Sequence, residues 1–177
     1  MYSRCRNAIF AVLPGMLLAP TAFAMTDSPA PFQIFGESYQ AVPNAAPDQA
    51  QVVYYRAGTE PVNTSGANVY IDGHFHTSLL PNGFTTFCLP PGSHMLGAYQ
   101  HDAPLYRGKR EELYRVQLEA GKTYFVKVAD NGTGTPISVN RVEAEQSLQN
   151  ARKQIHTISR ASTQQCKTLP SPQAASR

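Results

Sequence analysis

Short runs rich in Val, Tyr, Phe and Thr follow one another from residue 51 to residue 142, and turn residues separate them. Such runs are typical of half-buried strands, and Asp-Gly, Pro-Asn-Gly and Pro-Pro-Gly separators are typical of turns. Strands at this spacing with no helix between them indicate an antiparallel β-sandwich. The sequence therefore predicts a mainly β domain of seven or eight strands, drawn from residues 51–56, 68–72, 75–79, 84–89, 94–100, 113–118, 123–129 and 137–142.

One segment near the C-terminus has a different pattern. Residues 143–160 contain no Gly or Pro, and apolar residues recur there at intervals of three and four. This spacing predicts one amphipathic α-helix at about 143–160. Its apolar seam allows two interpretations. The seam packs on the sheet of its own domain, or it pairs with another helix, through Leu148, Ile155 and Ile158.

Both ends of the chain have their own composition. Arg4 and Arg6 precede an apolar run, and small residues at Ala22 and Ala24 follow it, so residues 1–24 are predicted to be a secretory signal peptide. Residues 25–48 are rich in Pro and Ala and predict a disordered leader, and residues 167–177 predict a disordered tail. The domain itself is expected at residues 49–166. We therefore expect an exported protein that is periplasmic, associated with the outer membrane, or secreted.

Removal of the signal peptide also changes the charge and the cysteine count. Arg4 and Arg6 leave with it, so the net charge falls from +3 to +1, and nucleic acid is not an expected partner. The apolar run is too short for a transmembrane segment. Cys88 and Cys166 remain, and in an oxidising compartment they predict one disulfide. Two separate thiols, or a bond between two molecules, are the alternatives.

Three stretches together resemble a known bacterial module. They are VYIDGHF at 69–75, LPPGSHMLGAY at 89–99 and LEAGKTYFVKV at 118–128. The chain is similar to PEGA-type, Ig-like β-sandwich domains of cell-envelope proteins, some of which precede an OmpA-type domain. The resemblance implies an envelope location and a non-catalytic accessory or binding role. It brings no catalytic residues, and because we expect no OmpA-type domain after this module, peptidoglycan binding is not carried over.

The histidines raise the question of a metal site. If Asp72 and Gly73 alone form the hairpin loop, Ile71 faces His74 and Val69 faces His76. A three-residue loop places Val69 opposite Thr77 instead and keeps an apolar face, so burial favours it. We expect no metal and no other cofactor, because zinc needs three or four converging ligands and only His74 and His76 are candidates here. His94, His101 and His156 are scattered over a strand, a loop and the predicted helix.

A long, charged connection spans residues 101–112. It mixes charges with Leu105 and Tyr106, and loops of this length are often functional, although a solvated connector is an equal alternative. Partner contacts are predicted at Tyr106, Arg107 and Arg110. We expect a non-catalytic envelope accessory or protein-interaction module. A small-molecule or metal-binding periplasmic protein is the alternative, and an enzyme is third, because no Gly-x-Ser-x-Gly motif is present.

Overall fold

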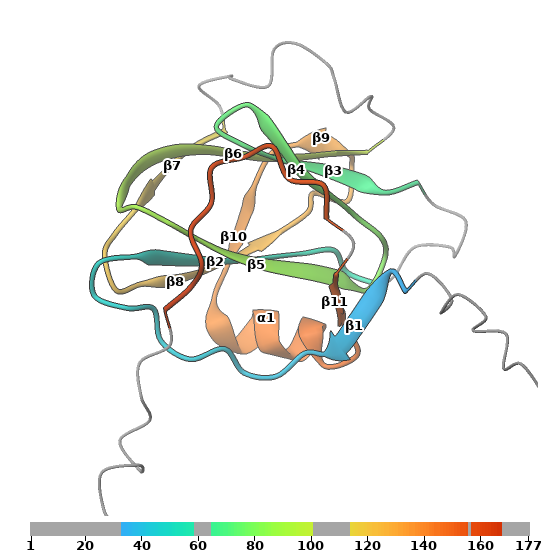
Figure 1. The fold of residues 1–177 in the computed structure, drawn as a ribbon. Helices are drawn as coiled ribbons and strands as arrows, with labels where there is room; N and C mark the ends of the chain where they lie inside the picture. The colour runs from blue at the N-terminus through green and yellow to red at the C-terminus, as the bar shows by residue number, and fades with distance from the viewer. Residues whose placement is uncertain (1–32, 59–64, 101–113, 156, 168–177) are drawn as a thin grey trace, which may run out of the picture. The chain divides into compact units, whose positions relative to one another are not determined.

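Within the residues that it describes, the computed structural model has two β-sheets and one α-helix, which confirms the predicted mainly β fold (Figure 1). It describes residues 33–58, 65–100, 114–155 and 157–167, all within one compact unit. The elements in chain order are β1 (Phe35–Ser38), β2 (Ala50–Tyr55), β3 (Ala67–Ile71), β4 (His74–Leu79), β5 (Gly83–Leu89), β6 (Gly92–Gln100), β7 (Arg115–Leu118), β8 (Thr123–Lys127), β9 (Thr133–Gly134), β10 (Ile137–Val139), α1 (Arg141–Leu148) and β11 (Arg152–Gln154).

The two sheets differ in their strand directions. Sheet A has the order β1-β11-β5-β2-β8-β10, and sheet B has the order β4-β3-β6-β7, with β9 beside β6. Most neighbours are antiparallel, but β2 runs parallel to β8 and β11 runs parallel to β5. The prediction of a purely antiparallel fold is therefore wrong at these two pairs. A parallel neighbour needs a long crossover, and the chain between β2 and β8 provides one by passing through sheet B.

The residues of β2 alternate between two hydrophobic cores. Val52 and Tyr54 belong to the shared core, to which strands of both sheets contribute. Val53 and Tyr55 face the other side of sheet A, where they pack with Leu148 of α1. Sheet B, sheet A and the helix thus form three successive layers (Figure 1). This double burial explains why β2 reads as a nearly continuous apolar run.

Helix α1 spans only Arg141–Leu148, so the predicted helix at 143–160 is wrong in its second half. After a short turn the chain becomes β11, which pairs with β5 and β1. The edge of β5 offers main-chain hydrogen-bond partners, which outweigh the helix propensity of this segment. Leu148 is buried, whereas Ile155 and Ile158 are 48% and 64% exposed and lie outside any helix or strand. Because the three residues share no helical seam, the predicted association through a helix is also wrong.

The segment predicted to be a disordered leader joins the fold from residue 33 onward. Phe35–Ser38 pairs with β11, and Ala45 and Ala46 are buried. Tyr39 packs edge-to-face on Phe84, with 5.4 Å between the ring centroids. The prediction of disorder is wrong for residues 33–48 because their few apolar side chains make contacts that are distant in sequence. The predicted signal peptide and residues 168–177 of the predicted tail lie outside the described residues.

The β3–β4 hairpin combines the two registers that the sequence allows. The Asp-Gly tip has positive φ angles of 50° and 77°, as a two-residue turn of this kind requires, and Ile71 lies opposite His74. The register then shifts, so that Val69 lies opposite Thr77. The extra residue in this β-bulge is His76. The register that burial favoured is thus wrong at the turn and confirmed at Val69 and Thr77.

Tyr54 provides a first test of the shared core. Its side chain is fully buried, and its hydroxyl has no hydrogen-bond partner among the described residues. A buried hydroxyl without a partner costs free energy, so Tyr54→Phe is expected to raise the free energy of unfolding by about 0.5–1 kcal/mol. Tyr124→Phe is the matched control, because the Tyr124 hydroxyl accepts a hydrogen bond from the Glu119 amide at 2.8 Å. Urea unfolding should show stabilisation only for Tyr54→Phe, and a larger loss for Tyr54→Phe than for Tyr124→Phe would contradict this account.

Candidate functional site

The C-terminal strap, residues 157–167, covers one side of the shared core. Figure 1 shows it leaving β11, crossing β4 of sheet B and then crossing β5 of sheet A near the C-terminal end of that strand. The Arg160 amide donates to the Phe75 carbonyl at 2.8 Å, and Gln164 forms a β-bridge with Cys88. The strap therefore spans both sheets at the side where β4 and β5 lie.

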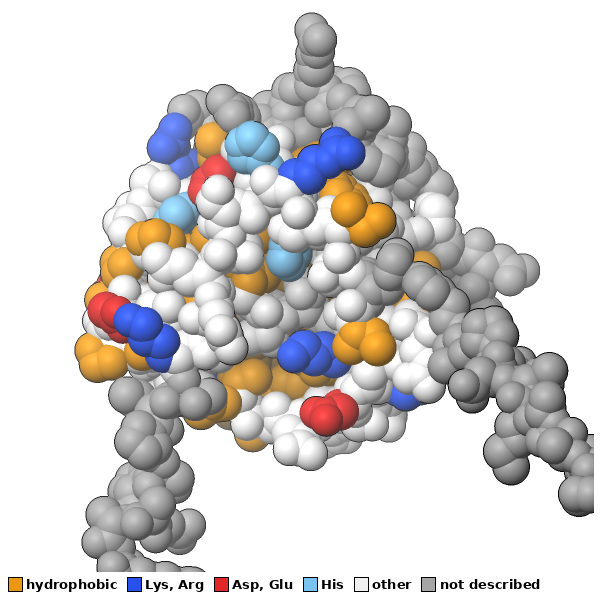
Figure 2. All heavy atoms as spheres, viewed as in Figure 1, with side chains coloured by type: hydrophobic (Ala, Val, Ile, Leu, Met, Phe, Trp, Pro, Cys, Tyr) orange, Lys and Arg blue, Asp and Glu red, His pale blue; other side chains and the backbone are white. Residues whose placement is uncertain are grey.

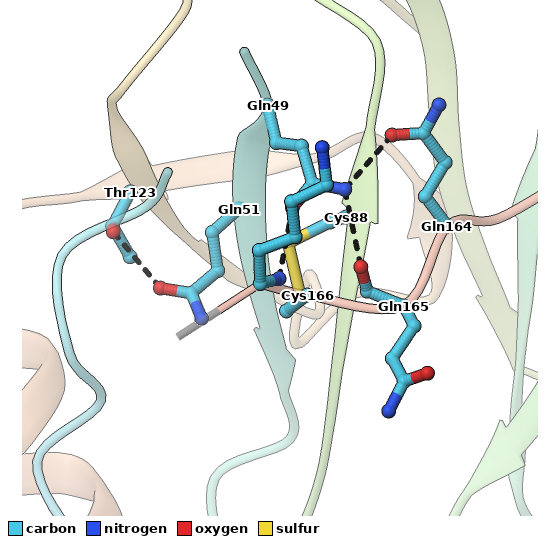
Figure 3. Close-up of a disulfide and its surroundings, with 8 residues drawn as sticks. Gln49, Gln51, Cys88, Thr123, Gln164, Gln165 and Cys166 are labelled. Carbon is cyan, nitrogen blue, oxygen red and sulfur yellow. Dashed lines mark hydrogen bonds between the residues drawn. A yellow bond between two sulfur atoms is a disulfide. The ribbon is translucent and has the colours of Figure 1, made fainter. Parts of the chain in front are cut away.

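A disulfide and a buried amide hold the end of the strap (Figure 3). The predicted Cys88–Cys166 bond is present, with 5.1 Å between the Cα atoms. Beside it, Gln49 is 2% exposed and donates from Nε2 to the Gln164 side chain at 3.0 Å and to the Gln165 carbonyl at 3.1 Å. Because the amide oxygen of Gln49 also accepts from the residue 167 amide, all three polar contacts fix the strap.

His76 lies beneath the strap and joins it to both sheets. Its Nδ1 lies 3.0 Å from Ser159 Oγ and its Nε2 lies 3.3 Å from Thr85 Oγ1, while its ring contacts Phe87 edge-on at 5.0 Å. The side chain is 6% exposed, and burial lowers its pKa to about 4. His76 is therefore neutral at pH 7, and each of its ring nitrogens has a hydroxyl group as its hydrogen-bond partner.

The structure separates the two histidines that the sequence offered as metal ligands. His74 is exposed beside the hairpin turn, whereas His76 is buried at the bulge. Among the described residues, no three His, Cys, Asp or Glu side chains lie close enough to hold a metal ion. The Cys88 thiol is also committed to the disulfide. His101 and His156 lie outside the described residues.

A contact between Asp72 and His94 was missed in the sequence. Asp72 accepts a hydrogen bond from the Met95 amide at 2.8 Å, and its other carboxylate oxygen lies 2.8 Å from His94 Nδ1. His94 Nε2 lies 2.9 Å from the Pro90 carbonyl. These contacts tie the Asp-Gly turn to the Pro-Pro-Gly turn and use both ring nitrogens of His94. The two turns are far apart in the sequence, so no sequence pattern indicated this contact.

The long connection that was predicted to contact a partner lies outside the described residues, as do Tyr106, Arg107 and Arg110. Those contacts remain a prediction. On the face that carries the strap, Lys, Arg, Asp and Glu side chains are scattered and gather in no patch of one sign (Figure 2). The described part of this face therefore presents no single charged surface for a partner.

On another side of the shared core, a groove of about 250 Å³ opens between the sheets. Its floor is apolar and buried, and its rim comes from the edge strands β7 and β10 with the residues that flank them. The lining residues are Leu96, Val116, Gln117, Leu118, Tyr124, Val126, Pro136 and Ser138.

The edge strands explain why the core is open here. Ser138 lies opposite Val126 in the β10–β8 register, so both side chains face sheet B, yet Ser138 is exposed. Sheet B therefore does not cover β10. On β7, Val116 and Leu118 point into the groove, while Gln117 between them is exposed. Among the described strands β7 pairs only with β6, so its other edge faces no described strand.

Comparison with protein-family models, with curated proteins and with solved structures found no match. Within the described residues, no helix has the length and apolar character needed to cross a membrane.

Proposed function

We propose that this chain is a non-catalytic interaction module of the bacterial cell envelope, built on an Ig- or PEGA-like β-sandwich. The signal-peptide pattern at residues 1–24 and the VYIDGHF, LPPGSHMLGAY and LEAGKTYFVKV stretches support an exported envelope protein. The disulfide suits an oxidising compartment such as the periplasm. The groove between β7 and β10 is the binding site in this proposal.

The partner is an extended polypeptide segment with an apolar side chain. The observation that carries this proposal is an apolar groove directly beside β7, a strand whose second edge faces no described strand. Main-chain hydrogen bonds to such an edge give affinity, and a pocket for alternate side chains gives specificity. Val116, Leu118 and Val126 supply the apolar contact surface.

The groove also has the chemistry of a binding surface. Its described lining residues carry no carboxylate, imidazole or thiol, and their polar groups are a carboxamide and two hydroxyls. The buried His76 and the paired His94 lie outside this lining. A segment held here would be recognised by shape and main-chain pairing.

A selection of displayed short peptides against the purified protein tests the proposal. Selected peptides should bind the wild type, and Ser138→Arg should weaken their binding by roughly tenfold, about 1.4 kcal/mol, by filling the groove from an exposed position. Val142→Arg is the matched control, because it adds the same charge to a residue that is 68% exposed on α1. Fluorescence anisotropy gives the affinities. Equal losses in both variants, or binding that Ser138→Arg leaves intact, would contradict the proposal.

A further inference from the structure

A separate cavity of about 220 Å³ lies on the other face of sheet A, between the segment around β1 and strands β2 and β5. Its walls include Phe84 and Thr86 of β5 and Val42 of the segment that follows β1. Phe84 belongs to the second core, between sheet A and α1, so the cavity borders that core and not the groove. None of its lining residues lines the groove.

Gln51 gives this cavity an unused hydrogen-bond donor. The side chain is 4% exposed and lines the cavity. Its oxygen accepts from Thr123 Oγ1 at 3.0 Å, and Figure 3 shows the amide nitrogen turned away from that contact. No described residue accepts a hydrogen bond from this nitrogen. The nitrogen is not one of the fully buried polar atoms that lack a partner, so it is open to the cavity and can donate to a ligand atom there.

Two unpaired charges of opposite sign also line the cavity. Glu37 lies on β1 and Lys153 lies on the neighbouring strand β11, and both side chains contribute to the wall. Neither forms an ion pair with a described residue. The adjacent Arg152, by contrast, donates twice to the Gly36 carbonyl, at 3.1 and 2.9 Å. The cavity thus offers one cation, one anion and one neutral donor around an apolar wall.

We propose that this cavity binds a small zwitterion of the free amino-acid class. Lys153 receives the carboxylate, Glu37 receives the ammonium group, and Gln51 Nε2 donates to an oxygen of the ligand. Phe84 and Val42 contact its carbon skeleton. A water molecule occupies about 30 Å³ in the liquid, so the cavity has room for a free amino acid. This function is additional to peptide binding in the groove.

A panel of the twenty standard amino acids, screened by thermal shift and then by titration calorimetry, tests the proposal. At least one should raise the melting temperature of the wild type. Lys153→Gln and Glu37→Gln, both at exposed residues, should each lower its affinity by roughly tenfold, about 1.4 kcal/mol. Lys122→Gln is the matched control, because Lys122 is exposed, pairs with Glu119 and lies outside the cavity.

Ser138→Arg separates this site from the groove, since it should leave amino-acid binding unchanged. A panel without any binder would overturn the proposal, as would affinity that survives both charge-removing substitutions. Acetate or propionate binding as tightly as the best amino acid would also overturn it, because Glu37 would then have no ammonium group to receive.

Discussion

Breaking the Cys88–Cys166 bond is expected to lower the free energy of unfolding by about 2–5 kcal/mol. The two residues are 78 positions apart, so the bond restricts a long loop in the unfolded chain. It also ties the strap to β5, beside the contacts that Gln49 makes. Without the bond, the hydrogen bonds of the strap alone must keep this side of the core covered.

Urea unfolding of the Cys88→Ala/Cys166→Ala protein measures this effect. Reduced wild type is the matched control, because reduction breaks the same bond and keeps both sulfur atoms. The two samples should unfold at similar, lower urea concentrations than the oxidised wild type. Labelling two free thiols in unreduced, denatured wild type would contradict the disulfide itself.

Acidification is expected to cost up to about 3 kcal/mol of stability through His76. Burial lowers the pKa of His76 from 6.5 to about 4 in the folded protein. The unfolded chain therefore binds the proton more readily than the folded one. This contribution is fully present above pH 6.5 and is lost as the pH falls toward 4. Ser159, Thr85 and Phe87 contact the ring, and none of them carries a charge.

The His76→Gln protein isolates the contribution of His76 to the pH dependence of stability, because glutamine keeps polar atoms near Ser159 but does not titrate. Its free energy of unfolding should change less between pH 7 and pH 4 than that of the wild type. His74→Gln is the control, since His74 is exposed. An NMR titration of the wild type should show that His76 stays neutral at pH 5.5. A normal titration of His76, or equal pH profiles for all three proteins, would contradict this account.

Local pattern predicted the strands well because their side chains meet the cores in simple alternation. On β2, Val52 and Val53 face different cores, and on β7 the exposed Gln117 separates two apolar residues. The helix and the leader were predicted less well, because the secondary structure of these segments depends on strand pairing with distant parts of the chain. Residues 152–154 become a strand since β5 offers an edge, and β1 exists only because β11 lies beside it.

The candidate sites could not be predicted from the sequence, because they too depend on how distant segments pair. A single bulge residue decides that His76 is buried while His74 is exposed, and neighbouring residues give no sign of that bulge. The groove lies where the sheets end at β7 and β10, which belong to different sheets, so the core between the sheets is open there. The disulfide was predictable because the number of cysteines and the expected compartment suffice for that inference.

We propose above all that an extended peptide binds between β7 and β10. The most direct test of this claim is a map of backbone amide chemical-shift changes when a selected peptide is added to isotope-labelled protein. We expect the largest changes at Arg115–Leu118 and Ile137–Val139, with smaller changes at Tyr124 and Val126. Changes centred on the C-terminal strap, or spread evenly over the described residues, would contradict the claim.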